Sequence, residues 1–249
     1  MKDKQVVLTG GTSGIGFAVA RRLAAEGCSL TLIGRSEERL AERIAQLSHP
    51  ARHQCVMCDL HDTPSIRGIA SALPPRVDAF VHAAGVTATL PLRALSYERM
   101  DALMRVNVYA FVELSRLIEA GKKANAPHLT SVVALSSIAA TRGGKGQTAY
   151  SASKAALEAC ITTLAKECVR KRIRFNAVRP GLVDTEMTRS WLRRAKLTGD
   201  FDPDRAQLSG MADPADIAAL IAFLVSDDSR HIVGSHIPID GGGPLSTLD

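Results

Sequence analysis

The sequence has few aromatic residues and no long apolar run. Phe, Trp and Tyr make up 4% of the 249 residues, too few for the stacked side chains of a single-strand nucleic-acid binder. The formal charge of +6 is spread along helical segments, so we expect no nucleic-acid partner. No apolar stretch reaches the roughly 18 residues of a membrane span, and the first residues do not resemble a secretory signal. We therefore expect a cytoplasmic protein with no membrane partner.

Cysteine is also scarce. The five cysteines are Cys28, Cys55, Cys58, Cys160 and Cys168, which are too few and too scattered for a disulfide framework and fit a reducing compartment. Cys55 and Cys58 form a C-x-x-C pattern within a strand-like segment. Residues three apart in a strand face opposite sides of the sheet, so these thiols cannot hold one metal ion together. We predict buried structural thiols and no metal site.

Short apolar runs alternate with longer amphipathic segments along the chain. The predicted strands are residues 5–10, 29–34, 53–59, 78–84, 130–137, 172–180 and 235–240. The predicted helices lie near 14–26, 37–47, 63–72, 96–120, 149–170 and 214–226. Strands that are apolar on both faces and are each followed by a helix indicate a parallel sheet covered on both sides. We predict a single-domain, doubly wound (Rossmann) α/β fold of about seven strands over residues 1–249.

Residues 185–212 contain no clear strand and mix helical and turn signals. The segment follows the predicted strand 172–180 at the carboxyl edge of the sheet, where open α/β folds bind ligands. It is interpreted as a mobile lid over a substrate, and an ordinary surface insertion is the alternative.

A glycine-rich turn joins the first predicted strand to the first helix, in TGGTSGIG (9–16). Glycine at Gly10, Gly14 and Gly16 permits a sharp turn, a close approach of a pyrophosphate to the main chain, and tight packing of helix on strand. The helix N-terminus attracts the phosphate charge. The position of this turn in an alternating chain predicts a dinucleotide site.

The end of the second strand decides which dinucleotide is preferred. An acidic residue there would bind the ribose hydroxyls, but the sequence has Gly34 and Arg35. The Arg35 guanidinium and the Ser36 hydroxyl suit a 2′-phosphate, so NADP(H) is favoured over NAD(H). The alternative for Arg35 is an exposed residue at a helix start. Asp59 ends the third strand, where it could bind the adenine amino group or cap a helix.

Four further motifs follow in order. Asn107 lies in VNVYAF, Ser137 ends a strand, Tyr150 follows thirteen residues later, and Lys154 stands four residues after Tyr150. The chain also contains RPGLVDT (179–185) and IPIDGG (237–242). Together with TGxxxGxG, this pattern resembles the short-chain dehydrogenase/reductase family from residue 5 to about residue 242.

The resemblance implies a catalytic set of Asn107, Ser137, Tyr150 and Lys154. Tyr150 would be the general acid in carbonyl reduction and the general base in alcohol oxidation. Lys154 would lower the tyrosine pKa by its charge and hold the nicotinamide ribose. Ser137 would donate to the substrate oxygen, and Asn107 would hold a water that links Lys154 to solvent. Taken alone, Tyr150 and Lys154 would more often be a surface pair than a catalytic one.

The resemblance also implies the groups around the cofactor. Pro180 and Gly181 would turn the chain under the nicotinamide, the Val183 backbone and the Thr185 hydroxyl would meet its carboxamide, and the pro-S hydride would be transferred. The expected cofactor-binding residues are Gly10, Thr12, Ser13, Gly14, Ile15, Gly16, Arg35, Ser36, Asp59, Leu60, Ala84, Gly85, Tyr150, Lys154, Pro180, Gly181, Val183 and Thr185.

One departure from the family pattern lies after the fourth strand, where NNAG is replaced by HAAG (82–85). The asparagine hydrogen bonds expected to brace the sheet then need a substitute. We expect His82 to supply one as a structural residue.

Two basic groups raise the possibility of an anionic substrate. The first is Arg189, Arg193, Arg194 and Lys196, and the second is Arg170, Lys171, Arg172 and Arg174. Either could face a carboxylate, coenzyme A or a phosphopantetheine, or could be a solvated helix face.

The sequence thus predicts an NADP(H)-dependent oxidoreductase that interconverts a small ketone or aldehyde and a secondary alcohol. The alternatives are a 3-oxoacyl-carrier-protein or acyl-CoA reductase and a catalytically silent NADP-binding regulator. A sugar epimerase or dehydratase is disfavoured by the chain length. In many members of the family that the sequence resembles, the long helices corresponding to 96–120 and 149–170 pair into a dimer interface, so the resemblance implies a homodimer or homotetramer. Leu157, Ile161 and Leu164 suit either that interface or the core.

Overall fold

The computed structural model describes residues 1–122, 128–198 and 207–243. In these residues seven parallel strands form one sheet in the order β3-β2-β1-β4-β5-β6-β7. The strands are β1 (Gln5–Thr9), β2 (Ser29–Gly34), β3 (Gln54–Met57), β4 (Ala79–His82), β5 (Thr130–Leu135), β6 (Ile173–Pro180) and β7 (His236–Ile239). The predicted doubly wound α/β fold is confirmed.

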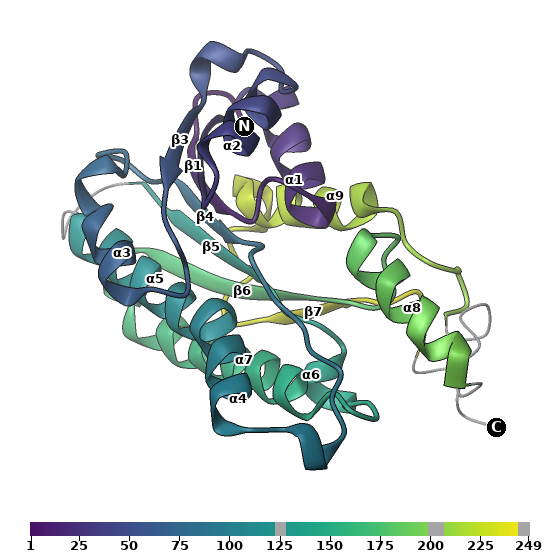
Figure 1. Ribbon diagram of the computed structural model, residues 1–249. Coiled ribbons are helices and arrows are strands. Elements are labelled where there is room, and N and C mark those ends of the chain that lie inside the picture. The colour runs from purple at the N-terminus through teal and green to yellow at the C-terminus, as the bar shows by residue number, and fades with distance from the viewer. Residues whose placement is uncertain (123–127, 199–206, 244–249) are drawn as a thin grey trace.

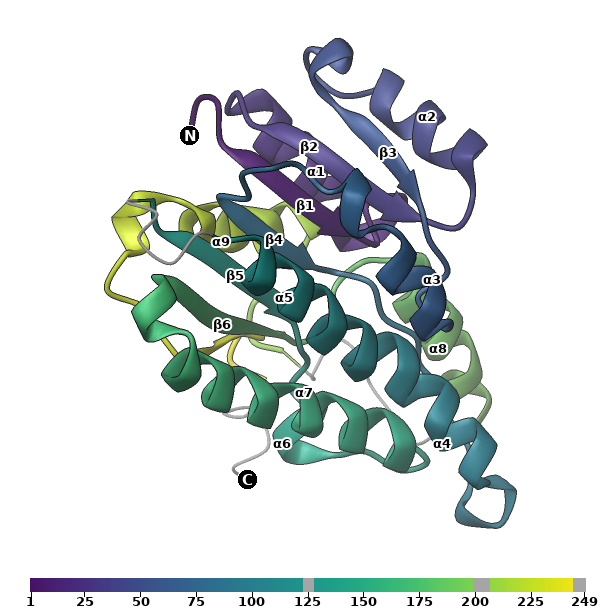
Figure 2. The same ribbon diagram turned by 90° about the vertical axis from the view of Figure 1, so that its left-hand side faces the viewer.

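Helices cover both faces of this sheet (Figure 1). They are α1 (Gly14–Ala25), α2 (Glu37–Ala45), α3 (Thr63–Gly68), α4 (Tyr97–Met104), α5 (Ala110–Gly121), α6 (Ala139–Arg142), α7 (Thr148–Glu167), α8 (Glu186–Thr198) and α9 (Pro214–Val225). The helices α1 and α9 lie on one face, and α3, α5 and α7 lie on the other, as Figures 1 and 2 show.

The core forms because consecutive strand residues point to opposite faces of the sheet. Val7 and Phe80 belong to the cluster packed against α5 and α7. Their chain neighbours Val6, Leu8 and Val81 belong to the cluster packed against α1 and α9. Both clusters are buried, so β1 and β4 are apolar on both faces, as the sequence predicted. The edge strands β3 and β7 are only partly buried.

The predicted long helix 96–120 is interrupted. It consists of α4, a π-helical turn at Arg105–Tyr109, and α5. A π turn adds one residue to a helical turn, and such turns are frequent at functional sites. Here the turn carries Asn107, which is fully buried against α7.

The expected lid at 185–212 begins with helix α8, which Figure 1 shows beside the end of the sheet where β6 stops. Residues 199–206 lie outside the described residues. The buried Gln207 fixes the segment that follows: its Nε2 donates to Leu182 O (3.2 Å) and Gly210 O (2.7 Å), and its Oε1 accepts from Leu182 N. A bridge between Val183 and Ala212 closes the same turn.

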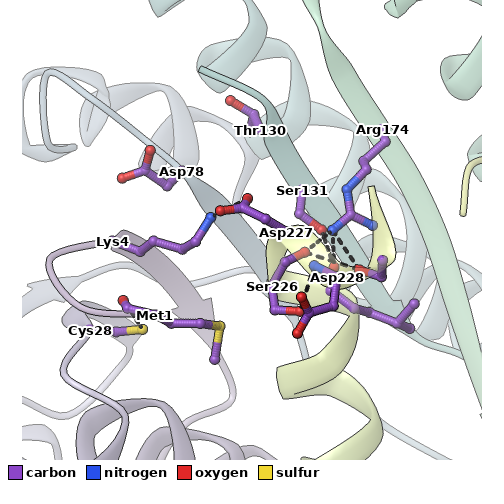
Figure 3. Close-up of polar contacts among 12 residues, drawn as sticks. Met1, Lys4, Cys28, Asp78, Thr130, Ser131, Arg174, Ser226, Asp227 and Asp228 are labelled. Atoms are coloured by element: carbon purple, nitrogen blue, oxygen red, sulfur yellow. Dashed lines mark hydrogen bonds and ion pairs between the residues drawn. The ribbon is translucent and has the colours of Figure 1, made fainter. Parts of the chain in front are cut away.

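The basic segment before β6 does not face the carboxyl edge of the sheet. Arg174, near the amino end of β6, is 2% exposed and donates to Leu224 O, Ser226 O (3.0 Å) and Ser229 Oγ (2.9 Å). Figure 3 shows its guanidinium pointing at the end of α9, beside Ser226 and Ser131. Burial lowers the pKa of Arg174 to about 10. A cation at a helix C-terminus stabilises the helix, so Arg174 anchors α9 to the sheet.

The remaining residues of that segment are not near a ligand site either. Lys171 pairs with Glu119 at 2.5 Å, while Arg170 and Arg172 are exposed. The suggestion that this second basic group faces an anionic substrate is therefore wrong. The reason is its position at the amino ends of the strands, opposite the edge where the cavity described below lies.

All five cysteines are free. Cys55 lies within β3, whereas Cys58 follows the strand and is buried, so β3 is shorter than predicted. Among residues 1–122, 128–198 and 207–243, no three His, Cys, Asp or Glu side chains gather as metal ligands would. No helix within the same residues combines the length and the apolarity needed to cross a membrane.

Candidate active site

A cavity of about 620 Å³ opens at the carboxyl ends of the strands. It lies where the strand order reverses between β1 and β4, the position at which doubly wound sheets bind ligands. The sequence-predicted residues that line it are Gly10, Thr12, Ser13, Gly14, Ile15, Gly16, Arg35, Asp59, Leu60, Ala84, Gly85, Ser137, Tyr150, Lys154, Pro180, Gly181, Val183 and Thr185. Ser36 and Asn107 were also predicted, and they do not line it.

The glycine turn fits the phosphates of a dinucleotide. Gly10 has φ of +72°, and a Cβ there would lie 2.6 Å from Ala84 N. A Cβ on Gly16 would lie 2.1 Å from Gly10 O, so no side chain fits at this position in the first turn of α1. Ser13 precedes α1 without a side-chain capping bond and lines the cavity. The first N–H groups of the helix and this hydroxyl are thus directed at one anion site.

Arg35 lines the same cavity, but Ser36 does not. The Ser36 hydroxyl accepts a hydrogen bond from Arg39 N (3.3 Å) and caps α2. A residue that the sequence did not reveal, Arg43, donates from Nε to Thr12 O (3.1 Å) and lies 4.8 Å from the centre of the Phe17 ring. The second helix therefore braces the glycine turn.

Asp59 lines the cavity at the end of β3. Its Oδ1 accepts from His61 N at 3.0 Å, while Asp62 caps α3. The helix-capping alternative for Asp59 is therefore wrong, and its carboxylate remains at the cavity wall.

Tyr150 and Lys154 lie one turn apart on α7 and both line the cavity. The Lys154 Nζ lies 5.8 Å from the centre of the Tyr150 ring. Burial raises the pKa of Tyr150, and a hydrogen bond with Ser137 opposes that rise. Ser137, on the loop after β5, thus contacts the phenol of Tyr150, with which it was predicted to act.

Lys154 is 3% exposed, and its Nζ donates to Leu135 O at 2.7 Å. Burial lowers the pKa of Lys154 to about 8, and the nearby Glu158 carboxylate opposes the shift. Lys154 was expected to lower the pKa of Tyr150, but in this structure the pKa of Tyr150 is raised. Desolvation of the phenol dominates, and the hydroxyl of Ser137 acts against it.

Asn107 lies behind the cavity rather than on its wall. Its Nδ2 donates to Val86 O (3.0 Å) and Ser153 Oγ (2.9 Å), and its Oδ1 accepts from Val86 N (2.9 Å). A Cβ on Gly85 would lie 3.4 Å from both Asn107 Oδ1 and Lys154 Nζ. The amide therefore joins the loop after β4 to α7 beside the lysine.

His82 is a buried residue that makes structural hydrogen bonds, as predicted. Its Nε2 faces Val106 O (3.1 Å), which can only accept, so Nε2 carries the hydrogen. Its Nδ1 then accepts from Thr9 Oγ1 (2.9 Å), which in turn accepts from Ala84 N (3.3 Å). Burial, with the Lys154 charge as a second cause, lowers the pKa of His82 to about 3. Neutral His82 thus ties β1 to the π turn that carries Asn107.

The segment after β6 contributes Met187, Thr188 and Ser190 to the cavity wall. Arg189 is not part of the wall, because its guanidinium pairs with Asp184 at 2.6 Å and 2.8 Å. Arg193 is exposed. The side chains of Arg194 and Lys196 lie outside the described residues.

The sequence did not reveal the buried carboxylate of Glu158. Its oxygens accept from Ser136 Oγ (2.7 Å), Arg179 Nε (2.7 Å) and Arg179 Nη2 (2.6 Å). Glu158 follows Lys154 by four residues, so the spacing that paired Tyr150 with Lys154 also marks Glu158 as part of the same helix face.

Comparison with known proteins was made on the whole chain. A family model described as enoyl-(acyl carrier protein) reductase matches residues 10–243. The chain is 31% identical to a 3-oxoacyl-[acyl-carrier-protein] reductase of Thermotoga maritima, over 97% of this chain and 98% of that protein. It is also 31% identical to a cyclopentanol dehydrogenase of Comamonas sp., over 97% of each.

Solved structures agree with these relatives. A short chain dehydrogenase/reductase family protein superposes with a TM-score of 0.88 at 31% identity, covering 98% of both chains. An actinorhodin polyketide ketoreductase, solved with NADPH, has a TM-score of 0.89 and covers all of both chains, but at 24% identity it shows the fold alone. The chain therefore belongs to the short-chain dehydrogenase/reductase family of oxidoreductases, which interconvert carbonyl and alcohol groups with a nicotinamide cofactor.

Proposed function

We propose that this protein is an NADP(H)-dependent carbonyl reductase or secondary-alcohol dehydrogenase in which Tyr150 moves the proton. The observation that carries the proposal is the convergence of Ser137, Tyr150 and Lys154 on one wall of the cavity. The glycine turn and Arg35 lie on the same cavity, so it has room and charge for a dinucleotide.

In the reductive direction, a nicotinamide held in this cavity would supply the hydride that the carbonyl carbon receives. The Tyr150 hydroxyl gives its proton to the carbonyl oxygen, and the Ser137 hydroxyl donates a hydrogen bond that holds this oxygen in place. The raised pKa of Tyr150 keeps the phenol protonated at neutral pH. In the oxidative direction the same oxygen accepts the alcohol proton.

Lys154 acts beside this phenol as a buried cation. Because its pKa is about 8, the ammonium is mostly charged at neutral pH. It would donate to the nicotinamide ribose and stabilise negative charge that develops on the Tyr150 oxygen. Asn107 lies next to Lys154 across Gly85, which supports a role in holding a water that returns a proton from solvent.

The cofactor preference rests on Arg35. Of the two side chains expected to bind the 2′-phosphate, Arg35 lines the cavity and Ser36 does not. A guanidinium suits the extra phosphate of NADP(H). Pro180, Gly181, Val183 and Thr185 also line the cavity, where they would hold the nicotinamide and its carboxamide.

The described cavity wall favours a neutral substrate. The wall that includes Tyr150 also includes Val86, Met187 and Ser190, and Arg189 is turned to Asp184. We infer that α8 is the part of the lid that contacts substrate, and that a small ketone or secondary alcohol fits this wall.

A second candidate is a 3-oxoacyl thioester reductase, which the name of the Thermotoga maritima relative favours. A silent NADP-binding regulator is disfavoured, because burying Lys154 beside Tyr150 costs stability that a protein without turnover does not need.

We also propose that the protein is a homodimer or homotetramer through α5 and α7. Leu157 and Ile161 are fully buried in the protein's own core, so they cannot form that interface. The outer groove of these helices is lined by Val112, Cys160 and Leu164. Light scattering of the purified protein tests the proposal, and a monomer would contradict it.

The experiment for the reaction is a substrate panel with NADPH. Cyclic ketones, diketones and acetoacetyl-CoA are offered separately, and the loss of reduced-nicotinamide absorbance is followed. We expect turnover of at least one neutral ketone. Turnover of acetoacetyl-CoA alone would favour the thioester reductase, and NADPH binding without turnover of any member would contradict the proposal.

A further inference from the structure

The face of α7 that carries Tyr150 and Lys154 continues to Glu158. The Glu158 carboxylate is 5% exposed and lies one turn beyond the lysine. A buried carboxylate is costly unless its oxygens are hydrogen-bonded and its charge is matched. Burial alone would raise the pKa of Glu158, but hydrogen bonds from Arg179 and Ser136 outweigh that effect and hold the pKa below its usual value.

The contacts of Glu158 join neighbouring strand ends. Ser136, next to Ser137, follows β5 and donates at 2.7 Å. Arg179, next to Pro180 on β6, forms a two-pronged pair at 2.7 Å and 2.6 Å. A bidentate guanidinium–carboxylate pair fixes direction as well as distance. The carboxylate therefore holds together the two chain segments that bear Ser137 and the Pro180–Gly181 turn.

His236 on β7 completes the network. Arg179 Nη2 lies 3.2 Å from His236 Nδ1, and Thr162 Oγ1 lies 3.2 Å from His236 Nε2 while it donates to Glu158 O (3.1 Å). Since Nδ1 accepts from the guanidinium, Nε2 carries the hydrogen and donates to Thr162. Arg179 contacts both carboxylate oxygens directly, so it is the main cation that matches Glu158.

The charged groups around Lys154 and Glu158 act on the protonation of the lysine. The titratable or charged groups that face Lys154 or Glu158 are Tyr150, His82, Arg179 and His236. Of these and Glu158, only Glu158 carries a negative charge at neutral pH, and its charge favours the ammonium form of Lys154. Arg179 in turn limits how much of that negative charge Lys154 experiences.

We propose that Glu158, set by Arg179, is a positioning residue that keeps Lys154 charged and fixes the strand end from which Ser137 projects. This inference rests on the proposed function, because it assigns Glu158 and Arg179 a task in the same reaction. Neither residue touches the reacting atoms.

The test compares two single variants with opposite effects on the protonation of Lys154, and the double variant that combines them. Glu158→Gln removes the negative charge, so Lys154 loses its proton at lower pH. Arg179→Met leaves the carboxylate unmatched, so Lys154 keeps its proton to higher pH. The double variant removes both charges, so we expect its behaviour to lie between those of the two single variants.

The readout is the pH dependence of NADPH affinity, measured by fluorescence titration, together with that of kcat/KM for NADPH. The alkaline limb should move down by about one pH unit in Glu158→Gln and up by a similar amount in Arg179→Met. The matched control is Glu113→Gln, whose carboxylate pairs with Arg67 and Arg116 away from the cavity. We expect its limb to stay at the wild-type position.

The outcomes separate the two claims. If wild-type enzyme turns over but neither limb moves, or both move in the same direction, Glu158 is only a structural pair and the inference is overturned. If NADPH affinity shifts as expected but no substrate is reduced, the inference stands and the proposed reaction does not. Should Glu158→Gln fail to fold by circular dichroism, the upward shift in Arg179→Met still decides the matter, because loss of packing would not strengthen binding at high pH.

Discussion

Neutral, buried His82 should make the stability of the protein depend on pH. Its pKa is lowered from 6.5 to about 3, so below about pH 6.5 the unfolded chain binds a proton that the folded protein does not. Stability therefore falls as the pH falls. Between about pH 7 and pH 5 the loss from this one residue is about 2 kcal/mol.

The assay is urea unfolding followed by far-ultraviolet circular dichroism at both pH values. The comparison is between the wild type and His82→Gln, whose amide can still donate to Val106 O but does not titrate. Other groups contribute equally to both proteins, so the difference isolates His82. We expect the wild type to lose about 2 kcal/mol more than the variant. Equal losses would refute the assignment of a buried, neutral histidine.

Three further changes follow from the site. Arg35→Ala should weaken NADP(H) binding by roughly tenfold to a hundredfold through loss of a charge-assisted hydrogen bond, and should leave NAD(H) affinity nearly unchanged. Equal losses of affinity for the two cofactors, measured by fluorescence titration, would refute the role of Arg35 in binding the 2′-phosphate. The pKa of Lys154 is lowered from 10.5 to about 8. Between about pH 8 and pH 10 the unfolding free energy of the wild type should therefore rise by about 2 kcal/mol relative to that of Lys154→Met. Parallel plots of unfolding free energy against pH for the two proteins would contradict a buried ammonium. Gly16→Ala should abolish cofactor binding because its Cβ would lie 2.1 Å from Gly10 O, whereas Gly68→Ala, with open space around the Cβ, should leave binding unchanged; similar affinities in the two variants would show that the glycine turn does not need its tight geometry.

The fold was predictable because its signals are local and repeated. Strands apolar on both faces, each followed by a helix, leave few arrangements other than a parallel sheet covered on both sides. The glycine turn and the Tyr150–Lys154 spacing are both visible within short stretches of sequence. Once the strand order was assumed, both motifs were expected at the same cavity.

The interruption at Arg105–Tyr109 could not be predicted in the same way. One inserted residue leaves the apolar pattern of a long helix nearly unchanged, and the sequence there has neither proline nor glycine. The consequence is large, because the π turn presents Val106 O to His82 and places Asn107 beside Lys154.

Charge was the other source of error. In the sequence, Arg174 was grouped with the basic residues that precede β6. In the structure it lies within β6, and carbonyl groups at the end of α9 accept hydrogen bonds from it. Glu158 would be a solvated helix residue in isolation, and only the strand order brings Arg179 to it. Which charges are buried is decided by contacts between distant segments, and a single sequence does not display these contacts.

The central claim is that the Tyr150 hydroxyl delivers the proton in carbonyl reduction. The most direct measurement is a single-turnover reaction of NADPH with a ketone substrate in wild type and Tyr150→Phe, with NADPH affinity measured in both. We predict that the variant binds NADPH within a few-fold of the wild type and that its hydride-transfer rate falls by at least about 10²-fold. A variant that reduces the ketone at the wild-type rate would contradict the claim.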